Sequence, residues 1–305
     1  MAETIGSIAE KIRKLQVQGA RNVAIAAVKA VQNMAEQTKA KNRTAFLTEL
    51  REAQAIFSAS RETEPLMRNA IRWVITQAQT ANTEKVAELS KLVVSAVNQF
   101  LKDLEDSKER IAEIEAKRIR DGSVVLTHCH SSTVTRLMAK AKADGKNFKV
   151  ICTETRPAFQ GRITAKELVD LGIETTFIVD SAARTFMGNV DLVIVGADGI
   201  TSEGNVVNKI GSSGIAVLAH EARVPFYVVS ELLKFDPATL SGECEKIEQR
   251  NPTEVWNEAP AKLLVCNPAF DVTPNRYIHS LICEEGIIAP QSIVQVMQRR
   301  YPWVF

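Results

Sequence analysis

The chain changes its pattern near residue 120, and this change limits the possible folds more than any other feature. Before that point, apolar residues recur at helical spacing, and glycine or proline occurs only at Gly6, Gly19 and Pro65. After it, short β-branched runs alternate with helical stretches, which is typical of parallel strands joined by crossover helices. The sequence therefore predicts an α/β protein, with a helical N-terminal domain at residues 1–120 and a mainly parallel sheet domain at residues 121–305.

Six apolar runs in the second part are the expected strands. They are nearly continuous, as expected for a sheet that helices cover on both faces. The six runs are Ser123–Thr127, Phe148–Thr153, Thr175–Val179, Leu192–Val195, Phe226–Val229 and Leu263–Val265. A long helix is expected near residues 85–120, and shorter helices are expected at residues 134–143, 164–171 and 215–222.

Polar residues follow several of these runs. Because ligands of open parallel sheets bind beyond the carboxyl ends of the strands, these residues are expected to meet at one edge. None of them is needed to build the sheet. They are His128–Ser132 after the first run, Glu154–Pro157 and Gln160 after the second, Asp198 after the fourth, and Ser230, Glu231 and Lys234 after the fifth.

Cys129 is the first candidate for catalysis. It lies at a strand end between His128 and His130 and ahead of an expected helix start, and these features can lower the pKa of a thiol. An Asp after a strand usually caps a turn, but the expected position of Asp198 across the crevice from Cys129 favours a functional role. A free Cys is more often a small buried apolar residue, which is the interpretation for Cys152, Cys244, Cys266 and Cys283.

Three segments combine an ordinary structural role with possible phosphate binding. Ser131–Thr133 begins a helix, where hydroxyls act as N-caps and free N–H groups also attract an anion. Asn208 and Lys209 are expected to open another helix, and a lysine there opposes the helix dipole unless an anion is bound. Gln18–Arg21 contains a helix break, which can equally bring backbone amides and a guanidinium to a phosphate.

Composition excludes several functional classes. The 38 basic and 36 acidic residues give a net charge of +2, and aromatic residues make up 6%, so nucleic acid is not an expected partner. No apolar run approaches the roughly 20 residues that span a bilayer, and no signal peptide is recognised. Five scattered cysteines without zinc-site spacing favour free thiols in the cytoplasm. We predict metal independence and no cofactor.

An ordered series of motifs across about residues 15–300 resembles one family. These motifs are THCHSS (127–132), TETRPAFQGRITAKEL (153–168), IVDSAAR (178–184), VGADGI (195–200), VVNKIG (206–211), KFDPATL (234–240), NPTEV (251–255) and NPAFDVTP (267–274). They look like the ribose-1,5-bisphosphate isomerases, which share a superfamily with methylthioribose-1-phosphate isomerases and the regulatory subunits of translation initiation factor 2B. The resemblance implies a Rossmann-like second domain.

The resemblance also assigns site residues. The isomerases keep a Cys in the first motif and an Asp in the fourth, here Cys129 and Asp198, whereas the alpha regulatory subunit typically lacks the Cys and carries Glu. Gln18 replaces the usual Arg of the family, which removes one phosphate contact, and Arg156 is expected to line the same pocket. Substrate contacts are implied for Gln18, Gly19, Ala20, Arg21, Arg61, Ser131, Ser132, Thr133, Gln160, Asn208, Lys209 and Lys234.

The implied reaction converts ribose 1,5-bisphosphate to ribulose 1,5-bisphosphate in AMP salvage that feeds a RuBisCO. In one scheme Asp198 protonates the ring oxygen and Cys129 removes the C2 proton; in the other a hydride shifts from C2 to C1 with Cys129 as an acid. The family also implies a homohexamer built as a trimer of dimers, and AMP as an activator. The alternatives are a non-catalytic regulatory subunit and a methylthioribose-1-phosphate isomerase.

Overall fold

The computed structural model describes residues 4–61 and 63–305. The chain divides into two compact units, Met1–Asp106 with Trp303–Phe305, and Ser107–Pro302. The predicted fold class is confirmed, because helices alone build the first part of the chain and a mainly parallel sheet follows. The assignment of residues 1–120 and 121–305 to separate domains stays a prediction. Each helix that the structure describes is too short or too polar to cross a lipid bilayer.

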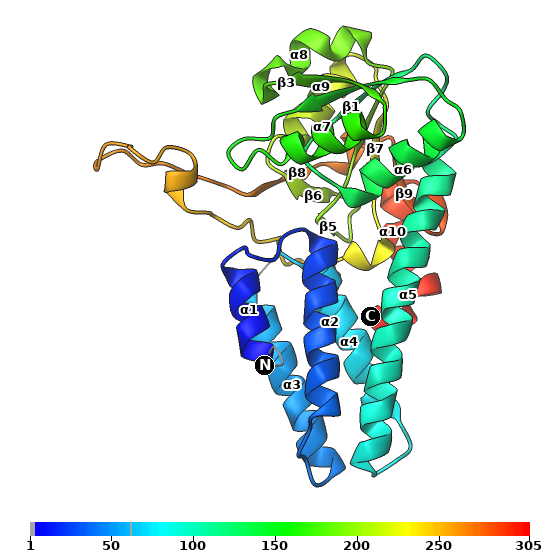
Figure 1. Ribbon diagram of the computed structural model, residues 1–305, viewed down its shortest axis with the longest axis vertical. Coiled ribbons are helices and arrows are strands. Elements are labelled where there is room, and N and C mark those ends of the chain that lie inside the picture. The colour runs from blue at the N-terminus through cyan, green and yellow to red at the C-terminus, as the bar shows by residue number, and fades with distance from the viewer. Residues whose placement is uncertain (1–3, 62) are drawn as a thin grey trace. The chain divides into compact units, whose positions relative to one another are not determined.

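The first unit is a helical bundle (Figure 1). Local signals set its helix starts: the Thr4 and Asn42 side chains cap two helices, and Pro65 begins a third. At the end of the chain, the Trp303 ring lies 5.3 Å from that of Trp73 and joins this unit. Its helices are α1 (Ile5–Arg13), α2 (Ala20–Glu36), α3 (Arg43–Ser60), α4 (Pro65–Thr80) and the first part of α5 (Val86–Ala116).

The second unit contains a seven-stranded sheet in the order β10-β9-β7-β4-β1-β2-β3. All neighbouring strands are parallel except β9 and β10. The strands are β1 (Val124–Thr127), β2 (Lys149–Thr153), β3 (Glu174–Ile178), β4 (Leu192–Val195), β7 (Phe226–Val229), β9 (Ser280–Cys283) and β10 (Gly286–Ile288).

Helices cover both faces of this sheet. The end of α5, α6 (Ser132–Ala143) and α7 (Gly161–Asp170) share one apolar core with the strands, to which β7 contributes Tyr227 and Val229. The alternate residues Phe226 and Val228 are also buried and point to the opposite face, where α9 (Ser212–Glu221) contacts β7. Two further helices, α8 (Ala183–Phe186) and α10 (Ile293–Arg300), complete the unit.

A small antiparallel sheet lies beside the large one in the same unit. It consists of β5 (Gly199–Ile200), β6 (Val206–Lys209) and β8 (Phe270–Thr273), in the order β5-β6-β8. Asn208 and Lys209 therefore end a strand, and the prediction that they open a helix is wrong. Helix α9 begins three residues later, at Ser212, because Gly211 turns the chain at φ 105°.

The predicted strand at Leu263–Val265 is also wrong. These residues belong to an arm at residues 243–267 that extends from the unit without regular strands (Figure 1, orange). Leu263 and Leu264 are 50% and 87% exposed, so the apolar run does not form core. The strand that pairs in parallel with β7 is instead β9 (Ser280–Cys283), which lies further along the chain.

The order of strands places a topological switch point between β1 and β4. After β1 the chain builds outwards through β2 to β3, and it then returns to the other side of β1 to form β4. At such a switch point, the connections that follow the two neighbouring strands run in opposite directions. The carboxyl ends of β1 and β4 therefore flank the usual ligand position of an open α/β sheet. Cys129 follows β1 and Asp198 follows β4.

Candidate functional site

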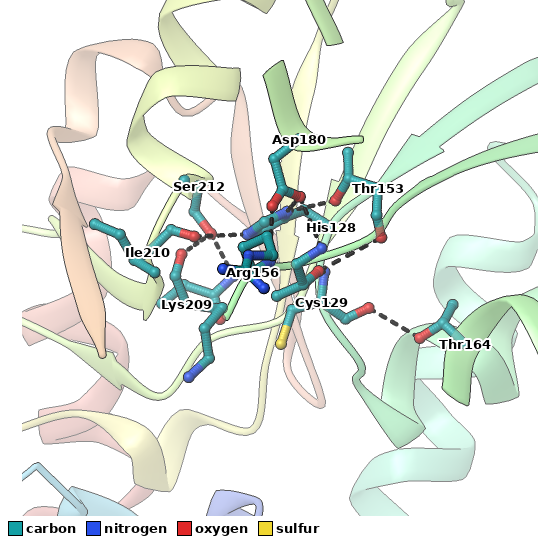
Figure 2. Close-up of polar contacts among 12 residues, drawn as sticks. His128, Cys129, Thr153, Arg156, Thr164, Asp180, Lys209, Ile210 and Ser212 are labelled. Carbon is teal, nitrogen blue, oxygen red and sulfur yellow. Dashed lines mark hydrogen bonds and ion pairs between the residues drawn. The ribbon is translucent and has the colours of Figure 1, made fainter. Parts of the chain in front are cut away.

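The loop after β1 holds Cys129 in a strained backbone conformation. Its φ is 67°, in the left-handed region that non-glycine residues rarely occupy, and Thr155 after β2 has a φ of 63°. The Cys129 N–H donates to Thr155 Oγ1 at 2.9 Å. The Cys129 carbonyl accepts from Thr164 Oγ1 at 2.9 Å (Figure 2). Strain that surrounding bonds maintain is characteristic of functional sites.

His128 ties this loop to two other segments. Its Nδ1 lies 2.6 Å from Thr153 Oγ1, and its Nε2 lies 2.8 Å from the Ile210 carbonyl (Figure 2). Burial lowers the pKa of His128, so the ring is neutral at pH 7. Because a carbonyl only accepts, Nε2 carries the proton and Nδ1 accepts from the threonine hydroxyl. At Gly211 a Cβ would lie 3.1 Å from this ring, so the loop packs directly on it.

Burial dominates the chemistry of the Cys129 thiol. Burial, together with the smaller effect of the negative charge of Asp198, raises the pKa of Cys129 to about 11. Lys209, the His130 backbone N–H and Arg250 act in the opposite direction but do not overcome burial. The expectation that the flanking histidines and the helix start lower this pKa is therefore wrong. Cys129 rests as a neutral thiol at pH 7.

The loop that carries Asp198 is held by a buried ion pair. The Asp198 N–H donates to the Val207 carbonyl at 2.9 Å. One residue earlier, the Ala197 carbonyl accepts from Lys234 Nζ at 2.8 Å, and this ammonium lies 3.2 Å from the buried carboxylate of Glu231. Lys234 thus positions the Asp198 loop. Its predicted substrate contact stays a prediction.

The start of α6 lies directly beside the end of β4. Ser131 is the N-cap of α6, and its hydroxyl accepts from the Val134 N–H at 3.4 Å. At Gly196 a Cβ would lie 2.8 Å from Ser131 Oγ, so only glycine permits this approach. Ser132 is half-buried and Thr133 is buried in the first turn. Phosphate binding by these three hydroxyl residues stays a prediction.

Asn208 and Lys209 are both buried at the end of β6. The Asn208 amide donates to Ser212 Oγ at 2.9 Å and thereby joins the strand to α9. Lys209 Nζ lies 4.8 Å from the centroid of the Phe270 ring. In Figure 2 the Lys209 side chain and the Cys129 thiol extend to the same side, away from His128. The structure therefore brings Cys129, Asp198 and Lys209 to one edge.

Gln160 and Arg156 lie on the loop after β2. Gln160 precedes α7, and its Oε1 atom is buried and accepts no hydrogen bond from the described residues. Arg156 is exposed; its Nη2 donates to the Val255 carbonyl in the arm at 3.0 Å. The predicted pocket-lining role of both side chains stays a prediction.

The other predicted contacts lie in the first unit. Gln18 Nε2 donates to the Leu15 carbonyl at 2.9 Å, and Arg21 Nη1 donates to the Leu104 carbonyl at 2.6 Å. Gly19 has a φ of 83° and precedes Ala20, the first residue of α2. Arg61 forms a buried ion pair with Glu64 at 2.7 Å. Substrate binding by Gln18, Gly19, Ala20, Arg21 and Arg61 stays a prediction.

Sequence reasoning missed several residues that build this edge. Asp180 (labelled in Figure 2) follows β3. Its carboxylate accepts hydrogen bonds from the N–H groups of Thr155 and Arg156, each at 2.7 Å. Its position after a strand was a usable signal. Thr164 lies inside α7 and follows no strand end, and Arg250 lies in the irregular arm, which has no periodic pattern.

The charged groups of the second unit favour an anionic ligand at this edge. Within residues 4–61 and 63–305, no three His, Cys, Asp or Glu side chains are grouped as metal ligands. The positive charges of Lys209 and Arg250 both lower the pKa of Cys129. Lys234 donates a hydrogen bond to the Ala197 carbonyl, next to Asp198 in the chain. Buried cations beside a thiol and a carboxylate suit a phosphorylated substrate on which protons are moved.

Comparison with known proteins identifies relatives of this chain over nearly its whole length. The chain is 42% identical over 306 residues to the ribose 1,5-bisphosphate isomerase of Pyrococcus furiosus, covering 98% of this chain and 94% of that protein. It is similar in structure to translation initiation factor eIF-2B of Pyrococcus horikoshii OT3, with a TM-score of 0.82, 31% identity, and coverage of 95% and 98% of the two chains.

A further similar structure is the 5-methylthioribose 1-phosphate isomerase of Pyrococcus horikoshii OT3, with a TM-score of 0.80, 30% identity, and coverage of 97% of this chain and 88% of that one. The model of the initiation factor 2 subunit family matches residues 16–290, which is most of the chain. The arrangement of the strands, the site between β1 and β4, and these matches lead to one conclusion: the chain belongs to the initiation factor 2 subunit family.

Proposed function

We propose that this protein is an aldose–ketose isomerase that converts ribose 1,5-bisphosphate to ribulose 1,5-bisphosphate. The observation that carries the proposal is the placement of the Cys129 thiol and the Asp198 carboxylate after the adjacent strands β1 and β4, with Lys209 beside the thiol. The similarity to the Pyrococcus furiosus protein of that name supports the same substrate.

The substrate dictates what these groups must do. A phosphate on C1 prevents the sugar from opening to a free aldehyde, so the bond between C1 and the ring oxygen must break while the phosphate stays attached. An acid must protonate the ring oxygen, and a base must accept a proton either from C2 or from its hydroxyl group. One thiol and one carboxylate are sufficient for both transfers.

The resting thiol favours Cys129 as the acid. Because the pKa of Cys129 is about 11, the thiol holds its proton at pH 7 and can give it to the ring oxygen. The hydrogen on C2 then moves to C1 as a hydride, and the proton of the C2 hydroxyl passes to Asp198. The C2 ketone is complete, and the proton on Asp198 restores the thiol.

The competing scheme assigns the groups in reverse. There Asp198 protonates the ring oxygen, and Cys129 removes the C2 proton to give an enediol phosphate. This order requires the thiol to lose its proton first, which burial opposes. The two schemes differ in the fate of the C2 hydrogen, which stays in the product only in the hydride scheme.

The test is production of ribulose 1,5-bisphosphate from ribose 1,5-bisphosphate in the presence of a chelator. Turnover by wild type that is lost in Cys129→Ser, with unchanged circular dichroism, supports the proposal. A well-folded wild-type protein that gives no product, with and without AMP, contradicts it. Methylthioribose 1-phosphate belongs in the same panel, because the chain also resembles an isomerase of that substrate.

The family resemblance extends the proposal to binding, assembly and location. We infer a homohexamer built as a trimer of dimers. We also infer substrate contacts from Gln18–Arg21, Arg61, Ser131–Thr133, Gln160, Asn208, Lys209 and Lys234. We further infer activation by AMP in a cytoplasmic nucleotide-salvage route. Light scattering during size-exclusion chromatography tests the hexamer, and the dependence of the initial rate on AMP concentration tests the activation. A stable complex with translation initiation factor 2 and no turnover would favour the regulatory-subunit function.

A further inference from the structure

Two cations converge on one aromatic ring near the thiol. Lys209 Nζ lies 4.8 Å from the centroid of the Phe270 ring, and the guanidinium carbon of Arg250 lies 6.0 Å from the same centroid. Both positive charges lower the pKa of the Cys129 thiol. Lys209 ends β6 and Phe270 begins β8, and these two residues are paired in the small sheet.

The base of the arm fixes the position of Arg250. Its N–H donates to the Asn267 carbonyl at 2.8 Å, and the neighbouring residues Gln249 and Pro268 form a β-bridge. The Arg250 side chain is only 7% exposed, whereas most of the arm beyond it lies at the surface. A buried guanidinium at a hydrogen-bonded position is pre-organised for a ligand.

The Arg250 guanidinium uses only part of its hydrogen-bonding capacity among the described residues. Arg250 Nε lies 3.2 Å from Glu248 Oε1, and among the described residues this is its only polar side-chain contact. The terminal nitrogens of Arg250 therefore have no acceptor in the part of the chain that the structure describes. A guanidinium whose terminal nitrogens lack an acceptor, on a side chain that is only 7% exposed, is suited to bind an anion.

We propose that Arg250 is a substrate-binding residue that, together with Lys209, binds a phosphate group of the sugar bisphosphate beside Cys129. The planar fork of arginine matches two phosphate oxygens, and lysine adds a point charge. This assignment rests on the proposed function for the identity of the substrate. Binding of a phosphate dianion at this position can be measured without turnover.

The direct test measures inorganic phosphate as a competitor of thiol alkylation. A Cys244→Ser, Cys266→Ser background removes the two exposed thiols, so that iodoacetamide modification, located by mass spectrometry, reports on Cys129. Phosphate is expected to slow this modification in the background protein. Arg250→Gln is expected to weaken the apparent phosphate affinity about 10- to 100-fold, the usual cost of losing a hydrogen bond between charged groups. Arg250→Lys, which keeps the charge but not the fork, should lose less.

Arg299→Gln is the matched control, because this arginine is 70% exposed on α10. It is expected to leave phosphate protection unchanged. Equal protection in Arg250→Gln and the background protein, with unchanged circular dichroism, would overturn the assignment, and so would no protection in the background protein. If phosphate protects Cys129 through Arg250 but no isomerase turnover is found, the proposed function fails while the anion site stands.

Discussion

Two groups of residues at the same sheet edge differ in the hydrogen-bond partners that the protein provides for their polar atoms. His128, Thr155 and Asp180 direct their polar atoms to partners in the protein, at 2.6–2.9 Å. Cys129 and Arg250 present a thiol and a guanidinium for which the described residues provide few partners. The first group holds the loops in place, and the second group is available to a ligand.

This difference separates two kinds of defect. Loss of a residue from the first group should lower stability and reduce activity through displaced loops. Loss of a residue from the second group should reduce activity or binding while the fold is retained, because a residue that faces a ligand contributes little to folding. The predictions below test this separation, beginning with the largest expected effect.

The largest effect is expected for the acid–base pair. Cys129→Ser and Asp198→Asn should each reduce kcat by about 10²- to 10⁴-fold, the usual contribution of a positioned acid or base. The midpoint of thermal unfolding should change little in either variant. Isomerase rates and differential scanning calorimetry measure the two properties. A variant with wild-type turnover would remove that residue from the pair.

The next effect is expected at His128. His128→Ala removes two buried hydrogen bonds and leaves the Thr153 hydroxyl and the Ile210 carbonyl without partners. The free energy of unfolding should fall by about 2–4 kcal/mol, measured by urea denaturation. His220→Ala, at an exposed position on α9, serves as the control and should change it by less than about 1 kcal/mol. Equal stability of the two variants would contradict the role of His128.

Gly211 tests the packing between the β6–α9 loop and His128. Its φ of 105° is unfavourable for any L side chain, and an added Cβ would lie 3.1 Å from the imidazole. Gly211→Ala should lower the free energy of unfolding by about 1–3 kcal/mol. Gly145→Ala has a comparable φ of 85° with no neighbouring atom within 4 Å, so it isolates the backbone cost. A smaller loss at Gly211 than at Gly145 would show that the ring contact adds nothing.

The smallest effect concerns the thiol. Its alkylation rate should rise with pH to a midpoint near 11, because burial keeps the thiol protonated below that pH. Lys209→Gln removes a cation that stabilises the thiolate, so the midpoint should move upwards by less than about one unit. Stopped-flow alkylation in the background without Cys244 and Cys266 measures both values. A midpoint below pH 8 would contradict the conclusion that burial keeps the Cys129 thiol protonated, and with it the role of Cys129 as the acid.

Much of this site could be predicted from the sequence. The alternation of strands and helices fixes a parallel sheet, and the ends of parallel strands meet at one edge, so Cys129 and Asp198 could be placed there without coordinates. The rest depends on long-range packing. Leu263–Val265 has the composition of a strand but finds no sheet to join, and Lys209 ends a strand because β8 pairs with it.

The chemical state of the thiol could not be predicted for a related reason. The neighbours of Cys129 along the chain favour a thiolate, but the pKa depends on how completely the folded protein excludes water. Arg250 was missed because the arm that carries it has no periodic pattern, and its approach to Phe270 depends on the bridge between Gln249 and Pro268.

The central claim is that Cys129 and Asp198 isomerise a sugar bisphosphate with Cys129 as the acid. Ribose 1,5-bisphosphate with deuterium at C2 tests it in one measurement, in which the product is analysed by NMR after conversion in ordinary water. We predict ribulose 1,5-bisphosphate that retains the deuterium at C1, formed by wild type and not by Cys129→Ser or Asp198→Asn. Product without deuterium would contradict the role of Cys129 as the acid, and the absence of any product would contradict the proposed function itself.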